Sequence, residues 1–324
     1  MTKNLKYTAL CLFVTLLASA CSKDGADGND VSKPNEETPE EIRFNADVWK
    51  MAEATRATFY NTGTLSSGSF MVSAYVAEST TPYINPVIVD WVTDKWEFSD
   101  GKHYWPAEGS LDFFAYMPTS IPSYITDLSD VASQVTYAAR NPRFKCKNLP
   151  MTSAGQGSGL QEFVYALTTG RTKALDGASG VTLNFQHPFA RIDMKLSSAQ
   201  AKPVTINTIT FKTLKNNGTY TYNGSPNKWE LTGAATDFKV TLDHPFSVTG
   251  TDQDIGTSYM MIPQNWTGNI EVEATWDDWG VPLKHTLTKK IDAVNWAPGT
   301  CYTYTFTITE TDLIVNSAKY TEQW

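Results

Sequence analysis

Apolar and polar residues alternate with a period of two along most of this chain. Successive side chains of a β-strand point to opposite faces of a sheet, so the alternation predicts strands with one buried face. In the clearest stretch, large apolar residues are separated by threonines, which suit the pleated surface of a sheet. The alternating stretches are residues 70–76, 87–91, 111–115, 181–185, 192–196 and 302–308.

Clusters of Asn, Asp, Gly and Pro separate the alternating stretches and predict turns. Short strands with regularly spaced turns are typical of β-sandwiches. The length suits two sandwiches, one over residues 42–180 and one over 181–324, with the boundary in the turn at 176–180. The sequence therefore predicts an all-β protein of two β-sandwich domains in tandem.

The N-terminus has the pattern of an export signal. Two lysines precede an uncharged run from residue 7 to 17, and three small residues, 18–20, follow. A basic start, a short apolar run and a small-residue cleavage site make a secretory signal peptide, here residues 1–20. The apolar run is shorter than the roughly 20 residues that a membrane-spanning helix needs.

Cys21 follows these small residues, and the segment resembles a bacterial lipobox. The resemblance implies that the Cys21 thiol carries lipid and that Cys21 begins the mature chain. The alternative is an ordinary signal peptide with a chance cysteine. The acidic tract at 22–30 resembles the export signal of some surface lipoproteins of Bacteroidetes; as a calcium loop it lacks the EF-hand spacing. Residues 21–41 are polar and contain proline, which predicts a flexible tether.

The net charge and the cysteines restrict what the chain is expected to bind and how it is expected to be attached. A net charge of -8 and a pI near 5.1 argue against nucleic acid as a partner. Lipid at Cys21 would be the attachment to the outer membrane, because no second hydrophobic span follows the signal peptide. Cys146 and Cys301 would remain in the mature domains, either as a disulfide or as two buried thiols.

The sequence contains no recognised catalytic or metal-binding pattern. The four histidines, at 103, 187, 244 and 285, stand singly and form no metal-ligand motif. The glycine-rich run at 155–159 lacks the lysine of a phosphate-binding loop. His187 precedes a proline in an apolar segment, and we interpret it as structural. We therefore expect no enzyme activity, no metal and no cofactor.

Residues 276–279 read Trp-Asp-Asp-Trp, and both tryptophans are expected to be exposed. Aromatic faces stack on sugar rings and carboxylates accept hydrogen bonds from hydroxyl groups, so this run is a candidate glycan site. The alternative is a hairpin loop with aromatic residues packed beside it. A glycosidase would need a second, separated carboxylate, and the sequence names none.

Several segments together resemble the fimbrillin family of Bacteroidetes, which are the subunits of pili assembled from lipoprotein precursors. The resemblance rests on the order and spacing of these segments across nearly the whole chain. They are the lipobox with its acidic tail, 42–46 with 54–58, 104–106 with 111–118, 181–192, 259–264 and 296–304.

The resemblance implies two transthyretin-like β-sandwich domains and an assembly route. The precursor reaches the outer membrane as a lipoprotein, and a trypsin-like protease cuts after a basic residue near the N-terminus. The cut removes the lipid anchor and the first strand, and a strand from another pilin subunit fills the groove. The incoming strand restores the ladder hydrogen bonds, and the head-to-tail contact propagates a filament.

Carried onto this sequence, the route makes Arg56 the first candidate for proteolytic processing, with Lys50 and Arg43 as alternatives. A plain surface arginine is the other interpretation of Arg56. The donor strand would come from the tail, 312–324, where Leu313 and Val315 alternate. The other interpretation of the tail is a last strand that packs on its own domain.

The sequence thus predicts a structural subunit or tip adhesin of a cell-surface pilus. Its partners would be other pilin subunits and a glycan or protein receptor on a host or bacterial surface. The alternative function is that of a glycan-binding surface lipoprotein of the outer membrane.

Overall fold

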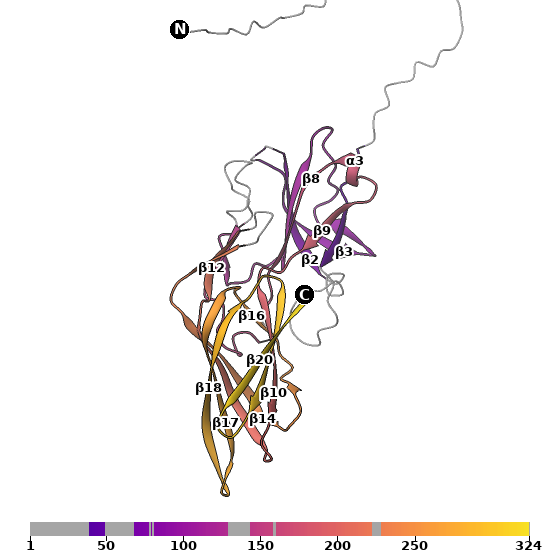
Figure 1. Ribbon diagram of the computed structural model, residues 1–324. Coiled ribbons are helices and arrows are strands. Elements are labelled where there is room, and N and C mark those ends of the chain that lie inside the picture. Colours follow the sequence, from indigo (N-terminus) through magenta and orange to yellow (C-terminus); the bar gives the residue numbers. More distant parts are fainter. Residues whose placement is uncertain are drawn as a thin grey trace, which may run out of the picture. The chain divides into compact units, whose positions relative to one another are not determined.

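The computed structural model describes residues 39–48, 68–77, 79, 81–128, 143–157, 160–221 and 228–323 (Figure 1). Residues 39–324 form one compact unit. Strands dominate the described residues. The helix α3 (Lys173–Asp176), which also lies in them, is four residues long. The all-β class predicted from the alternation is therefore confirmed. Cys21, Lys50 and Arg56 lie outside the described residues.

The first hydrophobic core is built from two sheets. One is antiparallel, in the order β4 (Lys95–Phe98), β3 (Pro82–Val92), β2 (Ser69–Val76), β5 (Leu111–Met117) and β8 (Val164–Arg171). The other pairs β1 (Phe44–Val48) with β9 (Val181–Phe185) in parallel. All seven strands place apolar residues in this core, and in β2, β3, β5 and β9 these include positions that the alternation predicts.

The second core also lies between two sheets. One has the order β15 (Gln253–Asp254), β10 (Ala190–Ser198), β19 (Thr300–Ile308) and β20 (Leu313–Gln323), and β16 (Tyr259–Met261) also pairs with β10. The other has the order β14 (Thr236–Val248), β11 (Val204–Leu214), β17 (Asn265–Asp278) and β18 (Val281–Asn295). Tyr304, Phe306 and Ile308 of β19 are completely buried here, as their alternation predicts.

A smaller third core joins residues from both halves of the sequence. Its sheet has the order β13 (Lys228–Thr232), β12 (Asn217–Thr221), β7 (Arg143–Cys146) and β6 (Ile125–Thr126). The hydroxyl groups of Tyr165 and Tyr220 lie 3.0 Å apart in this core. Contacts therefore cross the boundary predicted at residue 180, and β9, which follows it, belongs to the first core. A division into two domains at this point stays a prediction.

Cys146 and Cys301 do not form a disulfide. The Cys146 thiol is buried in the third core, and burial raises its pKa to about 12. The Cys301 thiol donates a hydrogen bond to Oδ2 of Asp193 at 3.2 Å. Of the two interpretations of this pair, the structure therefore shows the buried thiols.

Candidate functional site

β1 is attached along one edge to β9. The parallel register runs from Phe44 opposite Val181 to Val48 opposite Phe185, and the Val181 amide donates to the Arg43 carbonyl at 2.7 Å. The segment just before β1 is also anchored, because the Ile42 amide donates to the His103 carbonyl at 2.8 Å. Backbone bonds therefore hold the N-terminal segment to two parts of the chain that are distant in sequence.

Side chains at residues 42–45, where the chain enters β1, alternate between core and solvent. Ile42 and Phe44 are buried, whereas Arg43 and Asn45 are exposed. The Phe44 ring makes edge contacts at centroid distances of 5.3–5.7 Å with three aromatic side chains: Phe70, Phe98 and Phe113. We call the edge of β9 that β1 occupies, together with these three rings, the β1 seat. Burial of Ile42 and Phe44 in it stabilises the fold by about 1.5–3 kcal/mol for each side chain.

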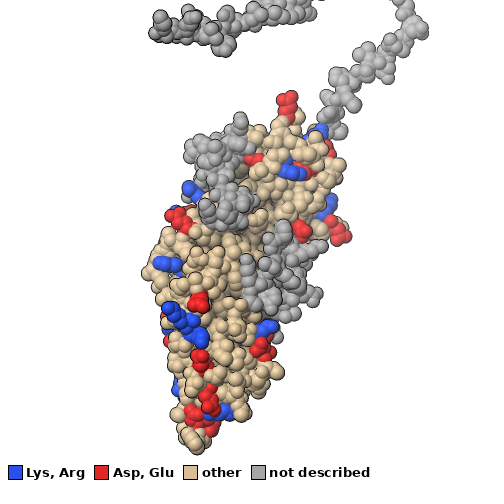
Figure 2. Space-filling view, in the orientation of Figure 1, with Lys and Arg blue, Asp and Glu red and all other residues tan. Residues whose placement is uncertain are grey.

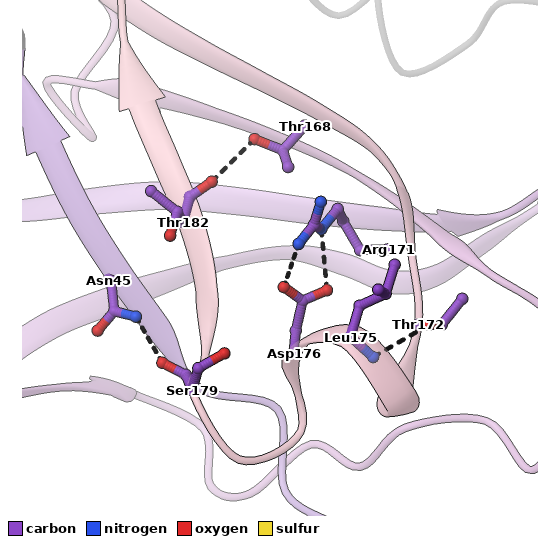
Figure 3. A network of polar contacts seen from close by, with 8 residues as sticks. All are labelled: Asn45, Thr168, Arg171, Thr172, Leu175, Asp176, Ser179 and Thr182. Carbon is purple, nitrogen blue, oxygen red and sulfur yellow. Dashed lines mark hydrogen bonds and ion pairs between the residues drawn. The ribbon is translucent and has the colours of Figure 1, made fainter.

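The turn that leads into β9 closes one end of the β1 seat (Figure 3). The Arg171 side chain pairs with Asp176, with Nε donating to Oδ2 at 2.8 Å, and Thr172 caps α3. Asn45 of β1 donates from Nδ2 to the Ser179 carbonyl at 2.6 Å. The sequence assigned this turn only the role of a domain boundary. Its position against Asn45 comes from tertiary contacts that local patterns do not encode.

Gly180 allows the close approach of this turn to β1. Its φ is +80°, a left-handed conformation that residues with a Cβ rarely adopt. An added Cβ would also lie 3.3 Å from the Arg43 carbonyl oxygen and 3.3 Å from Nδ2 of Asn45. The Asp-Gly-Ala-Ser-Gly run at 176–180 was the sequence signal for a turn, and the glycine at its end is the part that the β1 seat requires.

A groove of about 720 Å³ runs along β1. Among the described strands, β1 pairs with β9 alone, and residues 44–46 of β1 help to line this groove. The rest of the lining comes from residues 41–43, from Trp91, residues 94–98 and Lys102 of the β3–β4 region, and from Ala178 and Ser179 of the turn. Within the described residues, the groove therefore lies between β1 and the β3–β4 region.

The predicted processing sites differ in what they would release. Arg43 has an exposed side chain, but its carbonyl is bound by Val181, and a cut after it would leave Phe44 on the main fragment. A cut after Lys50 or Arg56, both outside the described residues, would sever all of β1. The geometry therefore favours Lys50 or Arg56 over Arg43 for release of the strand.

The C-terminal tail forms β20, which pairs antiparallel with β19 of the same chain. β20 is the last strand on its side of the sheet. Leu313 is buried in the second core, Val315 packs against that core, and Ile314 is exposed. Here the tail packs on its own chain, so a donor role for Leu313 and Val315 stays a prediction.

The remaining candidate residues separate into buried and exposed groups. Trp276 is 3% exposed and stacks on His285, so the expectation that it is exposed is wrong. Trp279 has a relative exposure of 102%. The Nδ1 atom of His187 lies 2.7 Å from Oε1 of Glu162, both side chains being buried, which fits a structural role for this histidine.

The described ranges bring no three His, Cys, Asp or Glu side chains together as a candidate metal site. Nor does any helix in them combine the length and the apolar character that crossing a bilayer requires.

The chain is similar to fimbrial and cell adhesion proteins in its sequence and in its fold. A family model described as fimbrillin-like matches residues 55–324. A fimbrial protein from Bacteroides vulgatus is 13% identical, with 87% of this chain and 99% of that chain covered at a TM-score of 0.61. A candidate cell adhesion protein from Bacteroides ovatus is 16% identical, with 87% and 97% covered at a TM-score of 0.53. These two likenesses show the fold. No curated protein matches the chain.

Proposed function

Because this chain belongs to the fimbrillin-like family, we propose that it is a structural subunit or tip adhesin of a cell-surface pilus. The precursor is held in the outer membrane by lipid on Cys21. A cut after Arg56 or Lys50 then removes the anchor together with β1. A strand from another subunit takes the vacated place in the β1 seat, and β20 is the candidate donor.

The observation that carries this proposal is the position of β1. It is short and is the first strand of the described residues, it fills an apolar site built by distant parts of the chain, and the candidate cleavage residues, Lys50 and Arg56, follow within eight residues of its end. Loss of β1 would expose the edge of β9 and the rings of Phe70, Phe98 and Phe113. An exposed strand edge beside an apolar trench is a template for strand addition.

Limited trypsin digestion of the chain that lacks residues 1–20 tests the route. We expect one early cut, after Arg56 or Lys50, followed by a stable core and a ladder of oligomers. N-terminal sequencing identifies the cut, and native size analysis detects the oligomers. The double variant K50Q/R56Q should stay uncut and monomeric, whereas R43Q should behave as the wild type. A core that is cut there and stays strictly monomeric contradicts strand exchange.

A glycan-binding surface lipoprotein of the outer membrane is the second candidate function. Complete exposure of Trp279 favours it, because an indole in solvent offers a stacking face for a sugar ring. Cell fractionation separates the two candidates. A full-length chain that remains in the outer membrane supports the lipoprotein, and a shortened chain in high-molecular-mass surface material supports the pilus subunit. Neither candidate assigns a catalytic residue to this chain.

A further inference from the structure

The tip of the β17–β18 hairpin carries an aromatic residue in an unfavourable place. Trp279 and Gly280 form the two-residue loop between Asp278 and Val281, with φ values of +59° and +85°. Two consecutive residues with positive φ make a hairpin turn that prefers Asn-Gly. A bulky aromatic residue at the first position strains the backbone. Since the Trp279 side chain is also fully exposed, neither turn geometry nor core packing accounts for it.

Polar contacts hold the base of this tip in one conformation. Nζ of Lys202 donates to the Asp277 carbonyl and to Oδ1 of Asp278, both at 2.8 Å. This ammonium group lowers the pKa of Asp278. The His285 ring lies 3.0 Å from the same carboxylate and stacks on Trp276, with 3.6 Å between ring centroids and an interplanar angle of 3°. The strands that present Trp279 are thus fixed before any partner arrives.

The surroundings of the tip combine an apolar rim with hydrogen-bonding groups. Val281 and Leu283, on β18 just after the loop, are exposed. The exposed Asp277 uses Oδ1 to accept the Gly280 amide at 2.7 Å, and Lys284 is also exposed. The loop projects at the lower end of the view in Figure 1, where Figure 2 shows acidic and basic side chains gathered close together.

We propose that this hairpin tip binds carbohydrate, with the Trp279 indole stacked on a pyranose ring and Asp277 accepting a hydrogen bond from a sugar hydroxyl. A lipid surface fits less well, because the tip would carry the carboxylates of Asp277 and Asp278 towards the bilayer with the indole. The proposal names the ligand class for the adhesive part of the proposed function. It does not depend on strand exchange, since every residue involved lies on a single subunit.

One stacked sugar makes a small contact, and repetition makes it effective. Polysaccharides and mucins present the same sugar many times. On the protein side, a pilus carries many subunits and a cell carries many pili. A single rigid indole at a projecting tip reaches such polymers without a deep pocket. The expected ligand is therefore a glycan with many copies of one sugar, and polymeric glycans are the appropriate probes.

Native electrophoresis through gels that contain starch, xylan, galactomannan or mucin tests the proposal on the monomeric chain without residues 1–20. We expect at least one polymer to retard the wild type, and retardation to weaken at least tenfold in W279N. The asparagine suits the turn, so W279N should melt at the same or a higher temperature. W279F should restore part of the binding. L175A, which shortens a side chain of α3 that is 62% exposed, is the matched control and should bind as the wild type.

The proposal is overturned if no polymer retards the wild type, or if W279N is retarded equally. It is also overturned if deglycosylated mucin retards the chain as well as mucin does, which would indicate a protein partner. Sedimentation with vesicles of phosphatidylcholine and phosphatidylglycerol that depends on Trp279 would indicate a membrane instead. Failure here leaves the trypsin test unaffected, and failure of that test leaves this one intact.

Discussion

The two terminal strands are attached to the molecule in opposite ways. β1 has five residues and pairs in parallel with β9, a strand far away in the sequence. β20 has eleven residues and pairs antiparallel with β19, which immediately precedes it. A tight turn joins β19 to β20, with the Thr309 amide donating to the Asp312 carbonyl at 3.0 Å. One strand is bound by a long-range contact and the other by a local one.

The two strands also differ in what they bury. The N-terminal segment places Ile42 and Phe44 in the first core within three residues. On β20, Leu313 is buried in the second core and Val315 is half-buried against it. β1 therefore combines a short backbone ladder with two buried side chains, whereas β20 has the longer ladder. A strand held by a few side chains in a preformed site is the kind that another strand can replace.

Truncation at the two ends of the chain should give the largest effect. A chain that begins at residue 57 should lose about 3–6 kcal/mol of unfolding free energy, because two large side chains leave the first core. It should also bind a hydrophobic dye, and a synthetic peptide of residues 39–50 should reverse both changes. A chain that ends at Val315 retains Leu313 and should lose less. Thermal and urea unfolding measure the difference, and equal losses would remove the distinction between the two strands.

Single core substitutions should measure how much unfolding free energy each of the two strands contributes through side-chain burial. Phe44→Ala should cost about 3–5 kcal/mol and Leu313→Ala about 2–5 kcal/mol, because each leaves a cavity. The two side chains belong to different cores, so the double variant should lose the sum within about 0.5 kcal/mol. The wild type, the two single variants and the double variant form a double-mutant cycle, and urea unfolding measures the stability of each. A coupling energy above about 1 kcal/mol would mean that the cores respond to each other.

Substitution of Gly180 should weaken the β1 seat alone. Gly180→Ala should cost about 1–2 kcal/mol, since the new Cβ is strained at positive φ and meets the Arg43 carbonyl. Gly170→Ala is the matched control, because its φ is +65° and an added Cβ meets nothing within 4 Å. Only G180A should raise hydrogen exchange at β1. The same increase in G170A would show that backbone strain, and not the contact, is responsible.

The smallest expected effect comes from one side-chain hydrogen bond. Asn45→Ala removes the bond to the Ser179 carbonyl and should cost about 0.5–1.5 kcal/mol. Asn316→Ala changes an exposed position on β20 and should be neutral within about 0.5 kcal/mol. Differential scanning calorimetry resolves this difference. An Asn45→Ala variant with unchanged stability would show that the turn stays on β1 without that bond.

The strands were largely predictable from the sequence because burial of one sheet face imposes its own period. Each alternating stretch, such as 181–185 or 302–308, is a strand whose alternating apolar residues are buried in a core or packed against one. The neighbours of those strands were not predictable, since period two fixes which face is buried but not which strand lies alongside. The parallel pairing of β1 with β9 is the clearest example.

The candidate site was predictable only in part. The first strand was expected to fill a groove of its own chain. In the structure this place is the β1 seat, which comes from four separate segments that share no local motif. Trp276 and Trp279 are three residues apart in one acidic run, yet one is buried and the other exposed. Trp276 continues the buried face of β17 in the second core and stacks on His285 across the hairpin, whereas Trp279 lies in the loop. Such a contact depends on hairpin register, which a single sequence leaves open.

The register of β1 against β9 also sets an order of events while the chain is made. The segment with Phe44 is made early, but its partner Val181 follows only after most of the first core has been made. Closing so long a loop is slow compared with forming a hairpin such as β19–β20. β1 is therefore made before the other strands of the first core and is among the last of them to be paired. For that interval the N-terminal segment lacks its strand partner, while the other strands of the first core fold without it.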